Sequence, residues 1–218
     1  MKDLNVNIRQ NARARRIIIK IRPGEVDLVI PRRGSLKKAL KFLESKEDWI
    51  RNRLAQQPDK IPLKIGSTYP ILGIPHEVIY DGFRGKSKIE GDKIIIHGDE
   101  KLAAQKIKNV VSDHLKIQLE KTVKIKTAET RTIAKKITIR DNVTRWGSCS
   151  SRGTLSFTWR IVFAPRFVME YLACHEVAHL REMNHGKRFW DLVEEIYPNY
   201  ASAEQWLKKN GHMLHLYN

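Results

Sequence analysis

The feature that most constrains this chain is a segment with two histidines and a glutamate near the end of a predicted helix. Residues 174–179 read C-H-E-V-A-H, which contains the pattern H-E-x-x-H, and apolar residues recur at helical spacing from Phe167 onward. Residues four apart share one helical face, so His175 and His179 can offer imidazole nitrogens to a single metal ion, with Glu176 beside them. This spacing fits one zinc ion and predicts that Glu176 activates a water molecule.

A third histidine follows the predicted helix. His185 and Gly186 come directly after Asn184, where a turn can return a side chain towards the ion. Hydrolytic zinc sites usually have three protein ligands and leave one position for water, so we expect His185 to be the third ligand. The alternative is a carboxylate on the next predicted helix, as third ligand or as acceptor from a ligand imidazole; the candidates are Asp191, Glu194 and Glu195.

Other interpretations of these histidines are weaker. His185 has the separation from His179 that the metzincin pattern H-E-x-x-H-x-x-G-x-x-H requires, but Glu182 replaces the glycine of its tight turn, which argues against metzincin membership. Histidines that merely interact with the dipole at a helix end would leave the spacing of Glu176 unexplained. Cys174 points away around the helix and is expected to pack. The remaining histidines are expected to be ordinary surface or core residues: His76, His97, His114, His212 and His215.

The net charge of the chain indicates the class of partner that it attracts. The 218 residues include 41 Lys and Arg against 24 Asp and Glu, a formal net charge of +17, and the excess is steepest before residue 60. Such a surface attracts DNA, RNA, a nucleotide or an acidic protein, or it simply aids solubility. No apolar run reaches membrane-spanning length and the first residues lack a secretory signal, so we expect no membrane association and a cytoplasmic location. The two cysteines, Cys149 and Cys174, agree with a reducing compartment.

Hydrophobic periodicity predicts an α+β fold. In residues 1–98 we expect a small, basic, β-rich region with strands at 16–21 and 26–30 around a Pro23-Gly24 turn and further strands at 69–72, 77–80 and 93–97. One helix over 36–54 should begin at an Ser35 N-cap and be anchored to a sheet by Trp49. Residues 99–218 should form a catalytic domain with a long helix over 100–127, strands at 137–140 and 154–163, and the metal helix packed on a small sheet.

Several motifs together resemble a known family. They are R-W-G-S-C at residues 145–149, the strand through Trp159-Arg160, Ala164-Pro165, the H-E-V-A-H-L run, and N-H-G followed by Phe189-Trp190. In this combination the chain resembles the bacterial YgjP-like family of zinc metallopeptidases, relatives of the SprT-type proteases. The resemblance implies a zincin-like catalytic domain in which the strand before the metal helix lines the cleft. It also implies His175, His179 and His185 as zinc ligands and Glu176 as catalytic acid and base.

Three functional hypotheses follow. The first is a zinc peptidase that cleaves polypeptides, with Arg145, Arg160 or Tyr171 as candidate donors to the oxyanion. If the strand at 154–163 is a sheet edge, a peptide substrate could add to it. The second is a metal-dependent hydrolase of nucleotide phosphate anhydrides, and the third is a non-enzymatic nucleic-acid-binding protein with structural zinc. Another divalent transition metal could replace zinc at three imidazoles, and the side chains that bind the substrate are not indicated by any motif.

Overall fold

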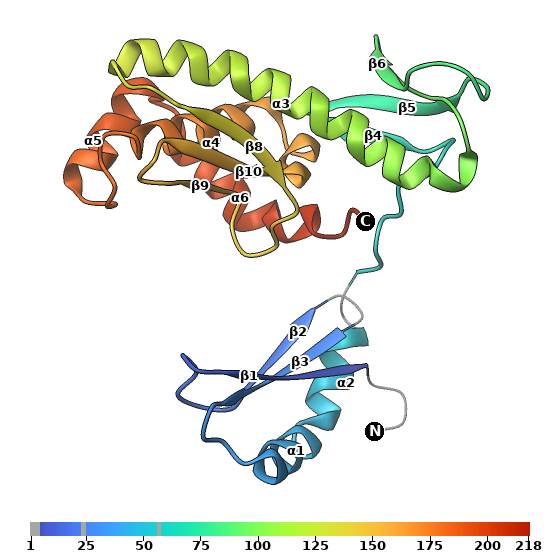
Figure 1. Ribbon diagram of the computed structural model, residues 1–218, viewed down its shortest axis with the longest axis vertical. Coiled ribbons are helices and arrows are strands. Elements are labelled where there is room, and N and C mark those ends of the chain that lie inside the picture. The colour runs from blue at the N-terminus through green and yellow to red at the C-terminus, as the bar shows by residue number, and fades with distance from the viewer. Residues whose placement is uncertain (1–4, 23–24, 56–57) are drawn as a thin grey trace. The chain divides into compact units, whose positions relative to one another are not determined.

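The chain has a mixed α+β structure made of two compact units, Met1–Lys60 and Ile61–Asn218. The computed structural model describes residues 5–22, 25–55 and 58–218 (Figure 1). The sequence predicted that the N-terminal region ends at residue 98, whereas the division between the two compact units falls after Lys60. The physical reason is a shared core: Ile71 and Ile94, from the predicted N-terminal region, are buried in the same apolar cluster as Ile107 of the following helix.

The first unit contains a three-stranded sheet. Its strands are β1 (Val6–Asn11), β2 (Ile18–Arg22) and β3 (Glu25–Pro31), in the order β1-β3-β2. β2 and β3 are antiparallel, which confirms the predicted strand pair, while β1 adds parallel to β3 and was not predicted. The predicted turn at Pro23-Gly24 lies outside the described residues.

Two helices follow where one was predicted. The predicted helix over 36–54 is divided into α1 (Leu36–Glu44) and α2 (Glu47–Ala55). The Ser45 hydroxyl donates to the Phe42 carbonyl at 2.8 Å, which satisfies a carbonyl at the end of α1. The Ser35 N-cap is confirmed, since its hydroxyl accepts from the Lys38 amide at 3.4 Å. The prediction that Trp49 anchors the helix to the sheet was wrong, because Trp49 remains 48% exposed. Ile50 is the fully buried residue of α2.

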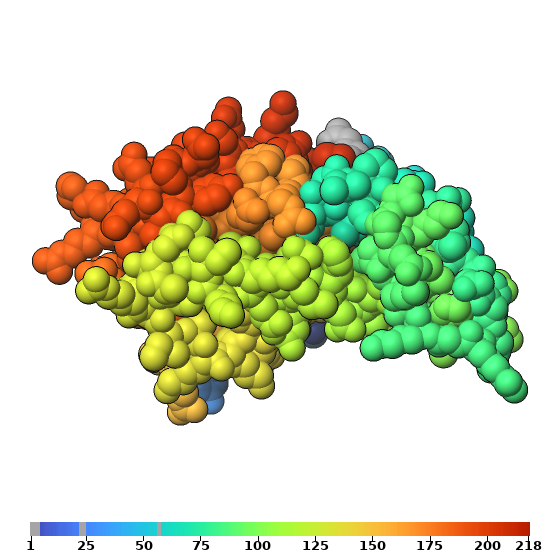
Figure 2. All heavy atoms as spheres, turned by 90° about the horizontal axis from the view of Figure 1, so that it is seen from above, coloured from blue at the N-terminus to red at the C-terminus, as the bar shows by residue number. Residues whose placement is uncertain are grey.

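The second unit begins with a four-stranded sheet and a long helix. The strands β4 (Thr68–Ile71), β5 (Ile74–Tyr80), β6 (Lys88–Glu90) and β7 (Lys93–Ile96) lie in the order β4-β5-β7-β6. A 3-10 turn, η1 (Glu100–Leu102), leads into α3 (Ala103–Thr130), so the predicted strands and long helix are confirmed. Figure 2 shows α3 as a continuous yellow-green band, with the green residues of this sheet region at one end.

A second sheet and three helices complete this unit. The strands β8 (Lys136–Arg140), β9 (Gly147–Cys149) and β10 (Thr154–Thr158) lie in the order β8-β10-β9. The strand predicted over 154–163 therefore ends at Thr158, continues as the 3-10 helix η2 (Trp159–Phe163), and is central rather than an edge. The helices are α4 (Arg166–Ala178), α5 (Lys187–Ile196) and α6 (Tyr200–Leu214).

Helix α4 is the centre of the second unit. It packs against α3, α6 and β9, and buried residues lie on most of its circumference. Such a helix has little freedom to move, so side chains near its end are held in place by the core. Among the described residues, no helix combines the length and apolar character that crossing a membrane requires.

Candidate metal centre and cleft

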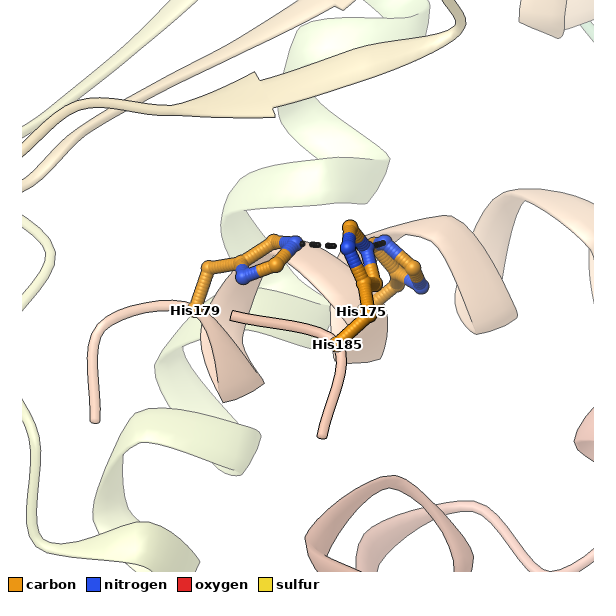
Figure 3. A group of neighbouring side chains, drawn as sticks. All are labelled: His175, His179 and His185. Carbon is orange, nitrogen blue, oxygen red and sulfur yellow. Dashed lines mark hydrogen bonds between the residues drawn. The ribbon is translucent and has the colours of Figure 1, made fainter. Parts of the chain in front are cut away.

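Three imidazoles converge at the end of α4. His175 lies in its last turn, His179 is its C-cap residue, and His185 lies in the segment just before α5. The Nε2 atoms of His179 and His185 are 3.1 Å apart, as are those of His185 and His175 (Figure 3). The structure thus brings together the three histidines that the sequence singled out, and they form a group that could hold a metal ion.

The spacing of the nitrogen atoms fits a small cation. A zinc ion with bonds of ~2.0–2.1 Å in tetrahedral geometry would hold two imidazole nitrogens about 3.3–3.4 Å apart. The observed separations of 3.1 Å are close to that value. The His185 Nε2 atom also faces two other ring nitrogens, and a single nitrogen cannot donate to both. A cation bound between the three Nε2 atoms would accept their lone pairs, which otherwise repel one another.

The hydrogen bonds behind two of the rings help to orient them. His179 Nδ1 lies 3.0 Å from the carbonyl oxygen of Glu182, which can only accept, so Nδ1 carries the proton and Nε2 presents a lone pair. His175 Nδ1 lies 3.4 Å from the Tyr171 hydroxyl. Burial lowers the pKa of His175 to about 3, with the neighbouring His179 and His185 acting in the same direction. Neutral imidazoles are the form that binds a metal ion.

The turn that returns His185 does not use a left-handed residue. Among the described residues, the non-glycine residues with positive φ are Leu72 and Arg131, so Glu182 has an ordinary backbone conformation. Gly186 has φ −79°, which any residue can adopt. The missing glycine of the metzincin pattern is therefore no obstacle to bringing His185 back to the other two histidines, because this turn follows a different path.

Glu176 is buried beside the histidines. Its side chain is 4% exposed, and its Oε2 atom has no hydrogen-bond partner among the described residues. Burial raises the pKa of Glu176 to about 8, and the charge of Arg145 opposes this effect. A buried carboxyl with an unsatisfied oxygen is costly unless a ligand or water meets it. A cation at the histidines would favour its charged form.

Gly147 allows the sheet to approach this carboxyl. A Cβ atom built on Gly147 would lie 2.9 Å from Glu176 Cδ and would overlap its Oε1 atom. Gly147 begins β9, one of the two end strands of its sheet, so the start of this strand lies directly against the carboxyl. From the sequence, Gly147 stands out only as part of the R-W-G-S-C motif; its approach to Glu176 was not predicted, and this motif was the signal that could have found it.

A cleft opens between these elements. It has a volume of about 370 Å³ and adjoins both His175 and Glu176. One wall is the segment that leads into β9, a second is α4, and a third is α6. Trp146 stacks on His215 with ring centroids 4.6 Å apart, and Gly211 leaves room for its indole. The lining residues are Arg145, Trp146, Gly147, Tyr171, Leu172, His175, Glu176, Glu204, Leu207 and Lys208.

The structure separates the candidate donors to the oxyanion. Arg145 and Tyr171 line the cleft, whereas Arg160 does not. Arg160 forms a close ion pair with Asp141, which also accepts from Lys108 at 2.7 Å. Burial alone would raise the pKa of Asp141, but Arg160 and Lys108 lower it to about 2. Arg160 therefore belongs to a cluster of charged side chains around Asp141 and is not available to an oxyanion in the cleft. Trp159 is 1% exposed and belongs to the core.

The remaining candidates lie outside the group of converging atoms. The carboxylates of α5 are exposed, and Asp191 pairs with Lys187 at 2.8 Å. Cys174 is fully buried among apolar side chains, as expected for a packing residue, and both cysteines are free. Among the described residues, none of the other five histidines joins a group of potential ligands.

Three imidazoles that could hold a metal ion thus lie beside a buried carboxyl, and comparison with known proteins gives the family. A family model described as "YgjP-like, metallopeptidase domain" matches residues 15–210. The chain therefore belongs to the YgjP-like family, and the resemblance drawn from its motifs is confirmed. This supports a metallopeptidase kind of function.

Similarity outside the family model is limited. Among solved structures, the chain is similar to the metallopeptidase zymogen abylysin of Pyrococcus abyssi, with 20% sequence identity and a TM-score of 0.38. The match covers 42% of this chain and 93% of that chain. No curated protein matches the chain.

Proposed function

We propose that this protein is a zincin-like peptidase in which His175, His179 and His185 hold one zinc ion and Glu176 is the catalytic acid and base. The observation that carries the proposal is the convergence of three Nε2 atoms beside a buried carboxyl with an unsatisfied oxygen. A bound zinc ion would supply Lewis acidity, which makes water a stronger acid and polarises a carbonyl group. Another divalent transition metal could serve the same three nitrogens.

The chain's own residues supply proton transfer and positioning. Glu176 would take a proton from the attacking water through its oxygen atoms and then give it to the leaving amine. Arg145, a cation that lines the cleft, could stabilise the developing oxyanion. Tyr171 instead holds His175 through the 3.4 Å contact between its hydroxyl and Nδ1, so its role would be to position a ligand.

The substrate would be a polypeptide that binds beside β9. A peptide could add to the strand at 154–163 only if that strand were a sheet edge, and β10 is central in its sheet. The edge strand β9 lies over Glu176 and could pair with an extended peptide through backbone hydrogen bonds, which gives loose side-chain preference. The free cysteines support a cytoplasmic location for this activity.

The test is hydrolysis by the zinc-loaded protein and by its Glu176→Gln variant. The substrates are an unfolded protein, such as reduced casein, and a panel of nucleoside triphosphates. We expect cleavage of casein to fall by roughly 10²–10⁴-fold in the variant while one zinc ion per chain is retained. Release of phosphate or pyrophosphate with intact casein would instead support the nucleotide hydrolase. Full activity of Glu176→Gln on its best substrate would contradict the proposed role of Glu176.

A chelator distinguishes the non-enzymatic alternative. A structural zinc ion is needed for folding, so its removal would unfold the chain. A catalytic ion held by a preformed helix end and turn should leave the fold intact when it is removed. We therefore expect circular dichroism to be unchanged by chelation while hydrolysis stops, and readdition of zinc should restore hydrolysis.

A further inference from the structure

The first unit has a groove beside the start of β2, one of the two end strands of its sheet. We name it the β2 groove and define it by the residues that line it: Arg16, Ile17, Ile18, Ile19, Phe42, Lys46 and Trp49. Its volume is about 520 Å³, and all of these residues belong to the Met1–Lys60 unit. The groove is therefore a property of this unit by itself, separate from the cleft at Glu176.

Apolar surface is left open in the β2 groove. Phe42 is 37% exposed and Trp49 is 48% exposed, although the unit has a core in which Leu28 and Ile50 are fully buried. The Ile17–Ile19 side chains of the groove are only partly buried. Two aromatic residues beside an aliphatic floor form the kind of surface at which partners obtain most of their binding energy.

A strand edge borders the same groove. β3 lies in the middle of its sheet and pairs with β1 and β2, whereas β2 is at the end of the strand order. An edge strand presents backbone N–H and C=O groups that can pair with another strand. An extended polypeptide beside β2 could therefore form backbone hydrogen bonds while it places alternate side chains against Phe42 and Trp49.

The positive charge of the groove favours an anionic partner. Its two ionisable lining residues, Arg16 and Lys46, are both cations. Residues 1–60 hold 16 Lys and Arg against seven Asp and Glu, so the whole unit has a positive field. Carboxylates on a peptide would be attracted to such a site, and a basic peptide would be repelled.

We propose that the β2 groove binds an extended acidic polypeptide segment that carries apolar side chains and adds as a strand to β2. The aliphatic floor and the strand edge favour this occupant over single-stranded nucleic acid, which depends on several phosphate contacts and on stacked bases. The inference goes beyond the proposed hydrolysis, because binding at this groove needs neither the metal ion nor Glu176.

The test measures binding to the full chain carrying Glu176→Gln, so that the probe is not cleaved. The probe is a short fluorescein-labelled peptide of alternating glutamate and valine, titrated by fluorescence anisotropy at physiological ionic strength. We expect saturable binding that weakens by about tenfold in Trp49→Ala, because this change removes a central aromatic contact. Lys46→Glu, an exposed substitution that spares the core, should also weaken it by about tenfold by reversing a charge of the groove.

Three controls make the result specific. Arg33→Glu makes the same charge change at an exposed position outside the groove and should alter the affinity by less than about twofold. A peptide with alternate N-methylated peptide bonds should not bind, because it cannot pair with the strand edge. A peptide with lysine in place of glutamate should not bind either.

Two results would overturn the proposal. One is an unchanged peptide affinity in both Trp49→Ala and Lys46→Glu. The other is binding of a single-stranded oligothymidine that is tighter than that of the peptide and is lost in Trp49→Ala, which would assign the groove to nucleic acid. Neither result bears on hydrolysis at Glu176, so the two proposals can fail separately.

Discussion

The two sides of the cleft are built in different ways. The metal side consists of the end of α4 and the turn to His185, and its histidines lie within one short stretch of chain. The opposite side combines the segment before β9 with α6, which lie far apart in the sequence. The difference teaches that local helix geometry can bring the three proposed metal ligands together, whereas the space in front of them depends on packing between distant segments.

The largest expected effect is on the metal side. His179→Ala should lower zinc affinity by more than about 100-fold, because the loss of an outer hydrogen-bond partner alone costs ~10–100-fold. Competition with a chromophoric chelator measures this affinity. His212→Ala, at an exposed histidine outside the cluster, is the matched control and should bind zinc normally. Retention of one tightly bound zinc ion in His179→Ala would remove the basis for treating this side as the metal site.

The next largest effect tests the side of the cleft that is opposite the histidines, where Gly147 lies against Glu176. Gly147→Ala should lower kcat by about 10²-fold with zinc still bound, because the new Cβ atom displaces the Glu176 carboxyl. Gly186→Ala is the matched control: a Cβ atom there meets nothing within 4 Å, and φ is −79°, so activity should change little. Equal kcat values in the two variants would show that β9 does not constrain the carboxyl.

A smaller effect concerns the orientation of a metal ligand. Tyr171→Phe removes the hydroxyl that lies 3.4 Å from His175 Nδ1 and should lower zinc affinity by roughly tenfold. In the control Tyr197→Phe, the lost hydroxyl donates to the Phe167 carbonyl instead, so stability can change while zinc affinity stays the same. Identical affinities in both variants would assign Tyr171 to the cleft wall alone.

The smallest effect concerns Trp146 at the cleft wall and the His215 ring that stacks on it. His215→Ala removes the ring that stacks on Trp146 at 4.6 Å and should raise KM by about two- to tenfold, as expected for an aromatic contact of ~0.5–1.5 kcal/mol. The value of kcat should remain close to that of the parent, since neither ring belongs to the group of converging histidines. His212→Ala again serves as control. A fall in kcat without a change in KM would mean that the stack positions the catalytic groups rather than the substrate.

The sequence predicted local features well and distant relationships poorly. It predicted α3, the strand pair β2 and β3, and the Ser35 N-cap, all of which depend on nearby residues. It placed the boundary of the N-terminal region at residue 98 because strand patterns cannot show which core they join, and β4 to β7 share the core of α3. It also left open whether the strand at 154–163 is a sheet edge, because strand order depends on pairing with β8 and β9.

The candidate oxyanion donors illustrate the same limit. A sequence shows that Arg145, Arg160 and Tyr171 carry suitable groups, but it does not show which partners they meet. In the structure, Arg160 is paired with Asp141, Tyr171 contacts His175, and Arg145 lines the cleft. Tertiary packing separates Arg160 from Arg145, whereas the contact of Tyr171 with His175, four residues further along α4, is local to the helix.

By itself, the sequence determined the three converging histidines and the adjacent Glu176, because helical periodicity and a short turn bring these side chains together without help from distant segments. Only the tertiary structure decided that Gly147 lies against the Glu176 carboxyl, that β9 is an end strand of its sheet, and that α6 lines the cleft. The physical reason is that such close approaches depend on how the core packs distant segments, and residue spacing along a chain carries little information about that packing.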